Sequence, residues 1–503
     1  MLKKQSTAFA IINTFFWKFG IQIFSILKHI LIAGYIGLSI QLDIFYMALA
    51  IFGIFITSWM LVFDNVAIPK LVEYSINNDW CNFKSLGSSL LGFSFILSIF
   101  FVLIVLFLPN HVSFLALGFS MEEKDHLARN FIWLFPAILL YLPLGVLYSI
   151  LKSVRQFSIF NKCEFIGSIS ILIFLFFFLY TEGVLYWSYS LGISLSFIIS
   201  FYFVFKKFSI LPKSPFENNL RSIVRAMPPL LIIHSSYYLF VMTDRFLVTF
   251  LNPGDIAALT YATVITYSMP QLLSLATYFL TAYSEEKKTI EKNRKFNEAI
   301  SLVLLIGFPT TVIFISTGDN IISILLERGV FSSDNSERVT YILSVLCFSI
   351  IPLCIQPALD QIYQAEKKLR RIIIIKCISL IFNVFLSAYL IFILHFGVIG
   401  AALGTTITYW FMLFMCLFDI NYFKIKILWM KHFKWLAWLV IFNSPILVKS
   451  FSNVSIVDLK IFDLFINIFL IITLTFFSVF TYLGQEKILF NRTISKFFST
   501  KHD

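Results

Sequence analysis

Charge is scarce in this chain of 503 residues. Only 13% of the residues are charged, which is about half the share in an average soluble protein, whereas 59% are hydrophobic and 61 are phenylalanine. Apolar runs of about 18 residues or more, each long enough to cross a bilayer as a helix, recur from one end to the other. This composition excludes a soluble globular protein and predicts an all-α integral membrane protein with about 14 transmembrane helices.

Sequence motifs of enzymes are absent. The chain has no GxSxG nucleophile elbow, no Walker A glycine loop, no HExxH metal motif and no DxD pair at a predicted interface. The largest predicted outside loops, about 109–128 and 317–337, are too short for the acidic catalytic domain of a polytopic glycosyltransferase. We therefore expect a transporter and not an enzyme. Without an ATPase module, transport must draw on an ion gradient or on the membrane potential.

Cysteine is also scarce, and its spacing is not that of a metal site. The six cysteines form no Cys-x-x-Cys or Cys/His pattern and stand at Cys81, Cys163, Cys347, Cys354, Cys377 and Cys416. None lies in a connection that we place outside the cell. We therefore expect small packing residues, with no disulfide and no bound cofactor.

Lysine and arginine are distributed unevenly between the connections of the predicted helices. They gather in every second connection, above all in 206–225, 287–295 and 367–371, and are few in the others. Positive charge marks the cytoplasmic side of a membrane protein, so we predict a bacterial inner-membrane protein with both termini in the cytoplasm. The net charge of +12 thus resides in short loops and not in a basic soluble domain, and we expect no nucleic-acid partner.

The two halves of the chain resemble each other. Each has a glycine-containing loop, then a helix with two prolines and a tyrosine: 115–120, Pro136, Pro143 and Tyr148 in the first half, and 326–332, Pro352, Pro357 and Tyr363 in the second. We interpret this as a parallel repeat, although chance similarity in a biased composition is the alternative. The predicted parts are an N-terminal lobe (1–206), a cytoplasmic linker (207–226), a C-terminal lobe (227–419) and two terminal helices with a cytoplasmic tail (420–503).

Polar residues on the first predicted helix, 10–36, follow helical spacing. One narrow stripe holds Thr14, Lys18, Gln22, Ser25 and His29, and Lys28 flanks it. A charged residue at the centre of a membrane helix costs roughly 2.5–3.5 kcal/mol on insertion scales, so the stripe must face a bundle interior or a water-filled cavity. The alternative is that Lys18 and Lys28 snorkel to opposite interfaces while Gln22 and Ser25 bond to neighbouring helices.

Charged residues in two further predicted helices are also candidates. Asp64 lies near the inner end of the second helix, 44–71, at a depth similar to that of Lys18, and an ion pair between them is one hypothesis. Asp244 and Arg245 lie near the outer end of the seventh helix, 227–250, where interfacial anchoring is the alternative to a functional role. The candidate substrate-binding residues are Lys18, Gln22, Ser25, Lys28, His29, Asp64 and Arg245.

Several stretches follow one another in the order of a known family. They are Gly37–Tyr46 with its Asp43-Ile-Phe, Ile68–Tyr74 (Ile-Pro-Lys-Leu-Val-Glu-Tyr), Met242–Phe246, Leu251–Ala262 (Leu-Asn-Pro-Gly-Asp-Ile-Ala-Ala-Leu-Thr-Tyr-Ala), Leu326–Ser332 and Gly397–Gly404. Together they resemble the MurJ/MviN lipid II flippases of the multidrug/oligosaccharidyl-lipid/polysaccharide exporter superfamily. The resemblance covers about residues 10–420 and implies two six-helix lobes around a V-shaped central cavity, plus two C-terminal helices.

The chain departs from this family at cationic positions. Gln22 and Lys28 stand where the family carries two arginines thought to hold the pyrophosphate, and His29 replaces the aspartate that follows. The arginine usual on the eighth helix is absent from Thr263–Thr266. Lysine lacks the bidentate fork of arginine but remains a good phosphate partner. These changes affect the expected substrate more than the flippase class.

The resemblance implies a flippase that moves a polyprenyl-pyrophosphate-linked oligosaccharide, in first place lipid II, within a membrane of lipids. The loss of arginines favours export of another unit, for O-antigen, capsule or exopolysaccharide, whereas the stretch 251–262 favours lipid II. A multidrug/cation antiporter of the same superfamily would need an acidic cavity, and this first helix is basic.

The resemblance also implies a sodium site with oxygen ligands from the seventh, eleventh and twelfth helices. The matching residues are Asp244, Asn383, Ser387 and Thr405. Oxygen-only ligands suit a hard cation such as sodium. Alternatively, Asp244 pairs with a basic group at the outer interface, and Asn383 and Ser387 bond between helices.

Overall fold

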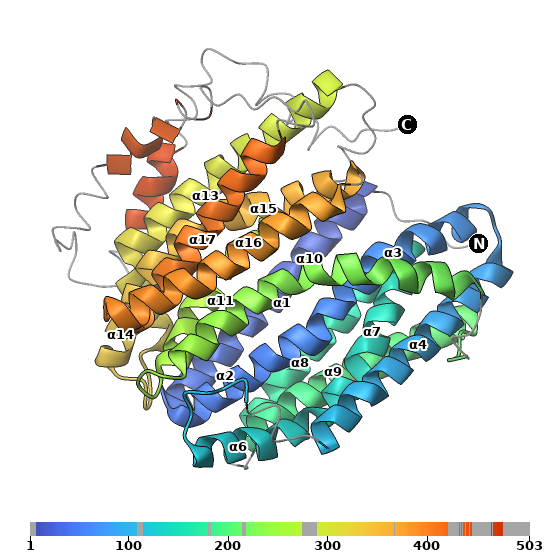
Figure 1. Cartoon of the computed structure of the whole chain (residues 1–503), viewed down its shortest axis with the longest axis horizontal. Coiled ribbons are helices and arrows are strands. Elements are labelled where there is room, and N and C mark those ends of the chain that lie inside the picture. The colour runs from blue at the N-terminus through green and yellow to red at the C-terminus, as the bar shows by residue number, and fades with distance from the viewer. Residues whose placement is uncertain are drawn as a thin grey trace. The chain divides into compact units, whose positions relative to one another are not determined.

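The computed structural model describes residues 7–107, 114–213 except 180 and 182, 218–273, 289–366, 368–420 and 466–475, together with scattered residues between 432 and 464. The described chain is helical and contains no strand among those residues (Figure 1). Eleven of its helical stretches are long and apolar enough to cross a membrane. The predicted all-α membrane fold is thus confirmed, while most of the two predicted terminal helices lies outside the described residues.

The helices in the first part of the chain are α1 (Thr7–Ile36), α2 (Ile40–Phe52), α3 (Ser58–Ile76), α4 (Trp80–Phe107), α6 (Met121–Phe131), α7 (Phe135–Ser153), α8 (Phe157–Phe178) and α9 (Val184–Phe208). Those that follow are α10 (Asn218–Val248), α11 (Asp255–Leu273), α13 (Thr289–Leu326), α14 (Ser333–Leu346), α15 (Ile350–Ala365), α16 (Leu369–Ala388) and α17 (Gly397–Ile420). A π-helical turn, Gly53–Thr57, joins α2 to α3 in one continuous span.

The repeated segments of the sequence have the same local structure. Ser120 caps α6 in a capping box with Glu123, and Ser332 caps α14 by accepting from the Asn335 amide. Each capped helix continues through one 3₁₀ turn, 132–134 or 347–349, into a helix with an internal proline. The serine hydroxyls satisfy amides that the first helical turn leaves unpaired, so the repeat in sequence is also a repeat of helix starts.

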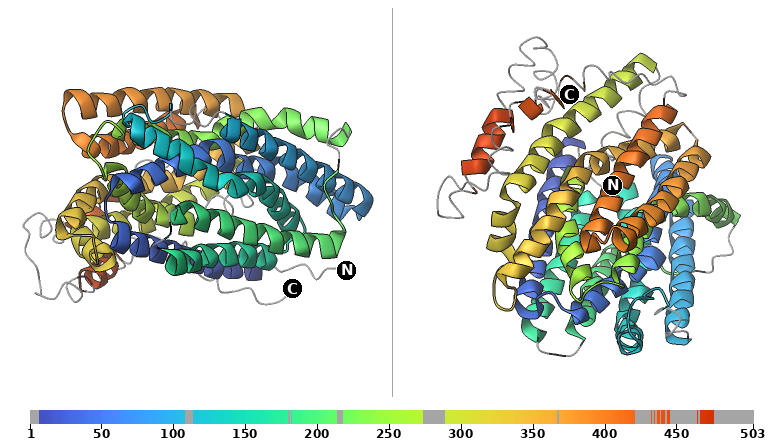
Figure 2. Two further views of the ribbon diagram at one scale, coloured as in Figure 1. Left: turned by 90° about the horizontal axis from the view of Figure 1, so that it is seen from below. Right: turned by 60° about the vertical axis from the view of Figure 1, so that its left-hand side comes forward.

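Packing divides the chain into two compact units. Unit 1 contains 1–260 and 376–401, and unit 2 contains 261–375 and 402–503. Within unit 1 the long helices lie side by side, as Figure 1 and Figure 2 show. α10 packs there against α2 and α3 although the sequence assigns it to the C-terminal lobe. The lobes, which the repeat defines, and the V-shaped cavity stay predictions.

Small residues bring α8 and α9 close together. A Cβ added at Gly192 would lie 2.9 Å from the Gly167 carbonyl oxygen and 2.3 Å from Cγ1 of Ile171. Beside this crossing, the Ser196 hydroxyl donates to the Cys163 carbonyl at 3.1 Å. Lipid provides no hydrophobic drive for helix association, so close van der Waals packing and interhelical hydrogen bonds hold such pairs.

We therefore expect Gly192→Ala to destabilise the purified protein, because overpacking a tight contact costs about 1–3 kcal/mol. The measurement is the midpoint of thermal unfolding in detergent. Gly318→Ala in α13 is the matched control, since its added Cβ would meet nothing nearer than 3.5 Å. Equal midpoints for the two variants would show that the α8–α9 crossing tolerates a wider spacing.

Candidate functional site

The polar stripe of α1 faces other helices of unit 1. On the opposite side of α1, Phe16 is 69% exposed, and Phe19, Ile23 and Leu27 follow it at helical spacing as exposed apolar side chains. The stripe contacts α8 through Lys18 and α9 through Lys28. Both lysines thus end on protein partners inside the bundle. Whether water reaches the stripe stays a prediction.

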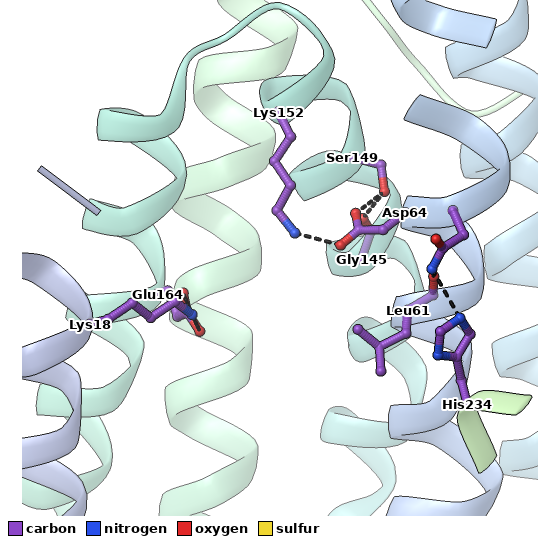
Figure 3. A network of polar contacts seen from close by, with 9 residues as sticks. Lys18, Leu61, Asp64, Gly145, Ser149, Lys152, Glu164 and His234 are labelled. Carbon is purple, nitrogen blue, oxygen red and sulfur yellow. Dashed lines mark hydrogen bonds and ion pairs between the residues drawn. The ribbon is translucent and has the colours of Figure 1, made fainter. Parts of the chain in front are cut away.

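An ion pair joins α1 to α8 in the half of unit 1 that we predict to face the cytoplasm, which we call the inner half. The Lys18 ammonium lies 2.7 Å from both carboxylate oxygens of Glu164 (Figure 3), and the two side chains are 33% and 28% exposed. Sequence reasoning did not single out Glu164. The available signal was a carboxylate in a predicted membrane helix, which needs a partner.

Asp64 pairs with Lys152 and not with Lys18, which corrects the ion pair suggested by depth alone. Lys152 Nζ lies 2.5 Å from Asp64 Oδ2, and the Ser149 hydroxyl donates to Oδ1 at 2.7 Å (Figure 3). Lys152 follows the apolar run 129–151, for which the sequence predicts a helix, but it occupies the last turn of α7. Residues Lys18, Glu164, Asp64 and Lys152 form what we call the inner ion-pair layer, whose charges cancel.

One aromatic ring connects the two ion pairs. The Lys18 ammonium lies 5.5 Å and the Lys152 ammonium 4.4 Å from the centre of the Phe160 ring. A ring face attracts cations at such distances. Phe160 therefore supports both lysines from α8 and keeps the inner ion-pair layer compact.

A second group of basic residues lies in the other half of unit 1, which we predict to face outward and call the outer half. The Lys28 ammonium donates to the Tyr189 hydroxyl at 2.7 Å, and Arg245 Nη1 donates to the Tyr46 carbonyl at 2.5 Å. The His29 ring stacks on the Tyr46 ring at 6.3 Å, and His29 Nδ1 lies 2.7 Å from the Ser25 carbonyl. We call Lys28 and Arg245 the outer cation cluster, and His29 lies beside it.

The partners in these contacts of the outer cation cluster are a hydroxyl, a carbonyl and ring faces. Arg245 also lies over the Tyr46 ring, at 5.8 Å. Asp244 is buried next to it and offsets part of its charge. The outer cluster is therefore positive as a whole, in contrast to the inner ion-pair layer. Gln22 lies half-buried on α1 between the two groups.

α10 is docked antiparallel on the α2–α3 span at three levels. Arg245 contacts the Tyr46 carbonyl, the Tyr238 ring covers Gly53, and His234 contacts Asn65. A Cβ at Gly53 would lie 2.7 Å from the Tyr238 ring, so only glycine permits this approach. Gly53 begins the π-helical turn, and such turns often occur at functional sites.

The outer end of α10 and the start of α11 are held by Asp43. Its carboxylate is buried and accepts from the Gly254 amide at 2.6 Å and from the Ala257 amide at 2.7 Å. Amides at a helix start are orphan donors with partial positive charge, so an anion is stabilised there. Nearby, the Gly118 amide donates to the Thr249 hydroxyl at 3.1 Å. The motifs around Asp43 and Gly254 were visible in the sequence, but this contact was not.

The four candidate sodium ligands are all buried. Asp244, Asn383 and Ser387 belong to unit 1, where the Asn383 amide lies 3.5 Å from the Ser387 hydroxyl. Thr405 belongs to unit 2. The sodium site stays a prediction. In the described part of the chain, no cluster of three or more His, Cys, Asp or Glu is placed to hold a metal ion.

Comparisons of this chain with a family model, with curated relatives and with solved structures point to the same family. The family model of the lipid II flippase MurJ matches residues 32–482. A probable lipid II flippase MurJ from Buchnera aphidicola (subsp. Acyrthosiphon pisum) is 26% identical over 495 residues, covering 95% of this chain and 96% of the relative. One from Aquifex aeolicus is 26% identical over 407 residues, covering 77% and 78%. The solved structure of a lipid II flippase MurJ in an inward closed conformation has a TM-score of 0.79 at 21% identity, covering 95% of this chain and 99% of that one.

The inner ion-pair layer yields a stability prediction. Lys18→Met should lower the thermal unfolding midpoint, because it leaves the Glu164 carboxylate without its ammonium partner in a region of low dielectric. The double variant Lys18→Met/Glu164→Gln should recover about half of the loss or more, since no unpaired charge remains. Lys70→Met is the control, because its Glu73 pair is exposed and contributes little. Additive losses in the double variant would contradict this account.

Proposed function

Because this chain belongs to the MurJ lipid II flippase family, we propose that it moves lipid II, a polyprenyl-pyrophosphate-linked oligosaccharide, from the inner to the outer leaflet by alternating access. The outer cation cluster is the observation on which the assignment of the substrate site depends. Lys28 and Arg245 approach from two different helices and meet tyrosines in a membrane-spanning bundle. A diphosphate offers several anionic oxygens, which form charge-assisted hydrogen bonds with such groups.

The outer cluster supplies the chemistry that a diphosphate needs. The Lys28 ammonium has three N–H donors, of which Tyr189 accepts one. The Arg245 guanidinium has five, and the Tyr46 carbonyl holds it in place through Nη1. Tyr189 thus positions Lys28, and Tyr46 positions both Arg245 and the His29 ring. In this proposal the diphosphate rests between Lys28 and Arg245, while the polyprenyl tail stays in lipid.

The inner ion-pair layer has a different role on the substrate path. Lys18 and Lys28 are separated along α1 by about 15 Å at the rise of an ideal helix. A diphosphate entering from the cytoplasmic side meets first the layer in which Glu164 and Asp64 already neutralise the lysines. The diphosphate therefore gains little binding free energy in the inner ion-pair layer and more at the outer cation cluster. The neutral, polar inner layer suits the sugar, which carries hydroxyls and amides.

Release to the outer leaflet requires the outer ends of the helices to separate. Asp43 holds the start of α11, and Gly118 and Thr249 join the loop before α6 to the end of α10. These contacts link the first-half loops to the α10–α11 turn. Rocking of one repeat against the other, as in transporters with repeated halves, would break and remake them.

The residues of the outer cation cluster also bear on two rival substrates, another lipid-linked oligosaccharide and a cationic drug. A lysine at position 28 gives up bidentate recognition, which favours a lipid-linked oligosaccharide other than lipid II. A multidrug antiporter receives support from a probable multidrug resistance protein NorM of Bacillus cereus, 27% identical over 208 residues, or 39% of this chain. The positive outer cluster opposes a cationic drug, so we keep the lipid-linked sugar.

Localisation and energy coupling follow from charge. Lysine and arginine in every second connection support an orientation with both termini in the cytoplasm, and membership of the flippase family supports a bacterial inner membrane. An anionic headgroup that moves outward runs down an inside-negative potential, which contributes about 2.3 kcal/mol per charge at 100 mV. We therefore propose that the membrane potential acts on the substrate itself, alone or together with a cation gradient.

The function is tested by complementation of a bacterial strain depleted of its lipid II flippase. Wild type should restore growth, and Lys28→Ala should reduce transport about ten-fold or more at equal expression, since a charge-assisted contact is worth about 1.5–3 kcal/mol. Lys28→Arg should be active. Lys206→Ala is the matched control, because Lys206 also meets a tyrosine hydroxyl but is exposed. Failure of wild type to complement would reject lipid II as substrate.

We also propose a sodium site that includes Asp244. Its carboxylate would balance one cation, so sodium should raise the thermal unfolding midpoint of the purified protein relative to potassium or choline. The rise should vanish in Asp244→Asn and persist in the control Asp334→Asn, which changes an exposed residue at the start of α14. Identical melting of wild type in all three salts would reject the site.

A further inference from the structure

The innermost contact between α10 and the α2–α3 span includes a histidine. The Asn65 side-chain nitrogen lies 3.0 Å from His234 Nε2 and 2.8 Å from the Leu61 carbonyl oxygen, and Figure 3 shows His234 beside this turn of α3. The Asn65 side-chain amide therefore has two hydrogen-bond partners, the Leu61 carbonyl and the His234 ring. It donates one hydrogen within α3 and the other across to α10.

This geometry requires a neutral imidazole. Asn65 donates both of its amide hydrogens, so Nε2 of His234 must present a lone pair. In a protonated His234 both ring nitrogens are donors, and Nε2–H would then point at an N–H. Turning the amide over would give the imidazole an acceptor but would place Oδ1 against the Leu61 carbonyl, which is also an acceptor. With a protonated imidazole, either orientation of the Asn65 amide therefore leaves two donors or two acceptors facing each other.

The charge around His234 also opposes a proton. Lys376 of α16 is buried, donates to the Ile233 carbonyl at 3.0 Å and interacts electrostatically with His234. From α3, the facing group is the neutral Asn65, because Asp64 turns toward Lys152 and Ser149. The charged group that bears on His234 in the described structure is thus a cation.

Among the three contacts that dock α10, only the one at His234 includes a side chain whose charge can change in water near neutral pH. Tyr238 contributes a ring to its contact with Gly53, and Arg245 remains charged at any physiological pH. Pro228 and Pro229 lie one to two turns before His234. Each proline removes a backbone hydrogen bond, so α10 is weakened next to this contact and can bend there.

We propose that His234 is a proton-binding site that couples proton uptake to the separation of α10 from α3. A proton binds to Nε2 and converts the imidazole to imidazolium, and the Asn65 hydrogen bond is lost. Lys376, which is bound to the adjacent Ile233 carbonyl, adds a like charge and so increases the cost of the imidazolium in the docked state. The neutral imidazole favours the docked state that the structure shows. The inference rests on the proposed transport cycle, in which helices of the two repeats separate and rejoin.

The test uses spin labels on α3 and α10 in the full-length protein, reconstituted in liposomes after replacement of its native cysteines. Leu61 and Ile232 are exposed and accept the labels. Pulsed electron paramagnetic resonance then measures the label separation at about pH 5.5 and about pH 8, on either side of the range in which imidazole titrates. Translocation of fluorescent lipid II is measured in the same liposomes.

In otherwise wild-type protein, the population with separated labels should rise about three-fold or more at the lower pH. His234→Gln should remove the pH response, because its amide oxygen accepts from Asn65 and gains no proton. Asn65→Asp should reverse it, since the introduced carboxylate accepts from imidazolium and holds the helices together in acid. His126→Gln, at an exposed histidine of α6, is the control and should respond like wild type.

A merely structural role for His234 would shift the separation equally at both pH values, and the Asn65→Asp reversal would not occur. Identical label distributions at both pH values in wild type, or an unchanged pH response in His234→Gln, would overturn the proton site. If labels respond to pH as expected but wild type moves no lipid II, the proton site stands and the proposed substrate is wrong.

Discussion

A charged side chain inside a bilayer needs a partner within the protein, and the packing of unit 1 depends on this constraint. Lipid offers neither hydrogen bonds nor counter-ions, so an unpaired ion costs several kcal/mol. The lysines of α1 accordingly point away from the exposed apolar face of that helix, toward α8 and α9. The same need places Asp64 against Lys152 at the end of α7. Charge thus determines which helix faces meet, and small residues such as Gly167 and Gly192 determine how closely.

The two groups of basic residues satisfy this constraint in different ways. In the inner ion-pair layer carboxylates neutralise the lysines, which fixes the helices but leaves little attraction for an anion. In the outer cation cluster a hydroxyl, a carbonyl and ring faces solvate the cations instead. Such partners orient a cation and cancel little of its charge. In the proposed site, a diphosphate would therefore form new interactions at Lys28 and Arg245 without displacing a carboxylate from the contacts with Tyr189 and Tyr46.

Several of these features follow from the sequence. Apolar runs predict the helices and 100° spacing predicts the stripe of α1, because each depends on residues near one another in the chain. The repeated loops were visible in the sequence, but their shared serine caps were not predicted. Glu164 and Lys152 were missed because their partners come from distant helices, which local pattern cannot identify. Asp43 belonged to a recognisable motif, but its contact with the α11 amides exists only after α2 and α11 meet. The predicted Lys18–Asp64 pair rested only on the similar depth of the two residues in the membrane. Depth does not indicate on which side of the bundle a residue lies.

α10 shows most clearly why connectivity and packing differ. The predicted lobes make it the first helix of the C-terminal lobe, yet it packs on the α2–α3 span within unit 1. It is also continuous with α11 through the Gly254 turn, where a positive φ and the nearby Leu38 backbone leave room for glycine alone. Movement of one predicted lobe relative to the other would therefore either break the contacts that dock α10 or bend α10 itself.

The contacts that dock α10 are single hydrogen bonds and a ring against glycine, each individually weak. The prolines and the π-helical turn lie at the levels where such a change would require the least rearrangement. The first helix of the predicted C-terminal lobe is thus held to the α2–α3 span by individually weak contacts, which is what the proposed transport cycle requires.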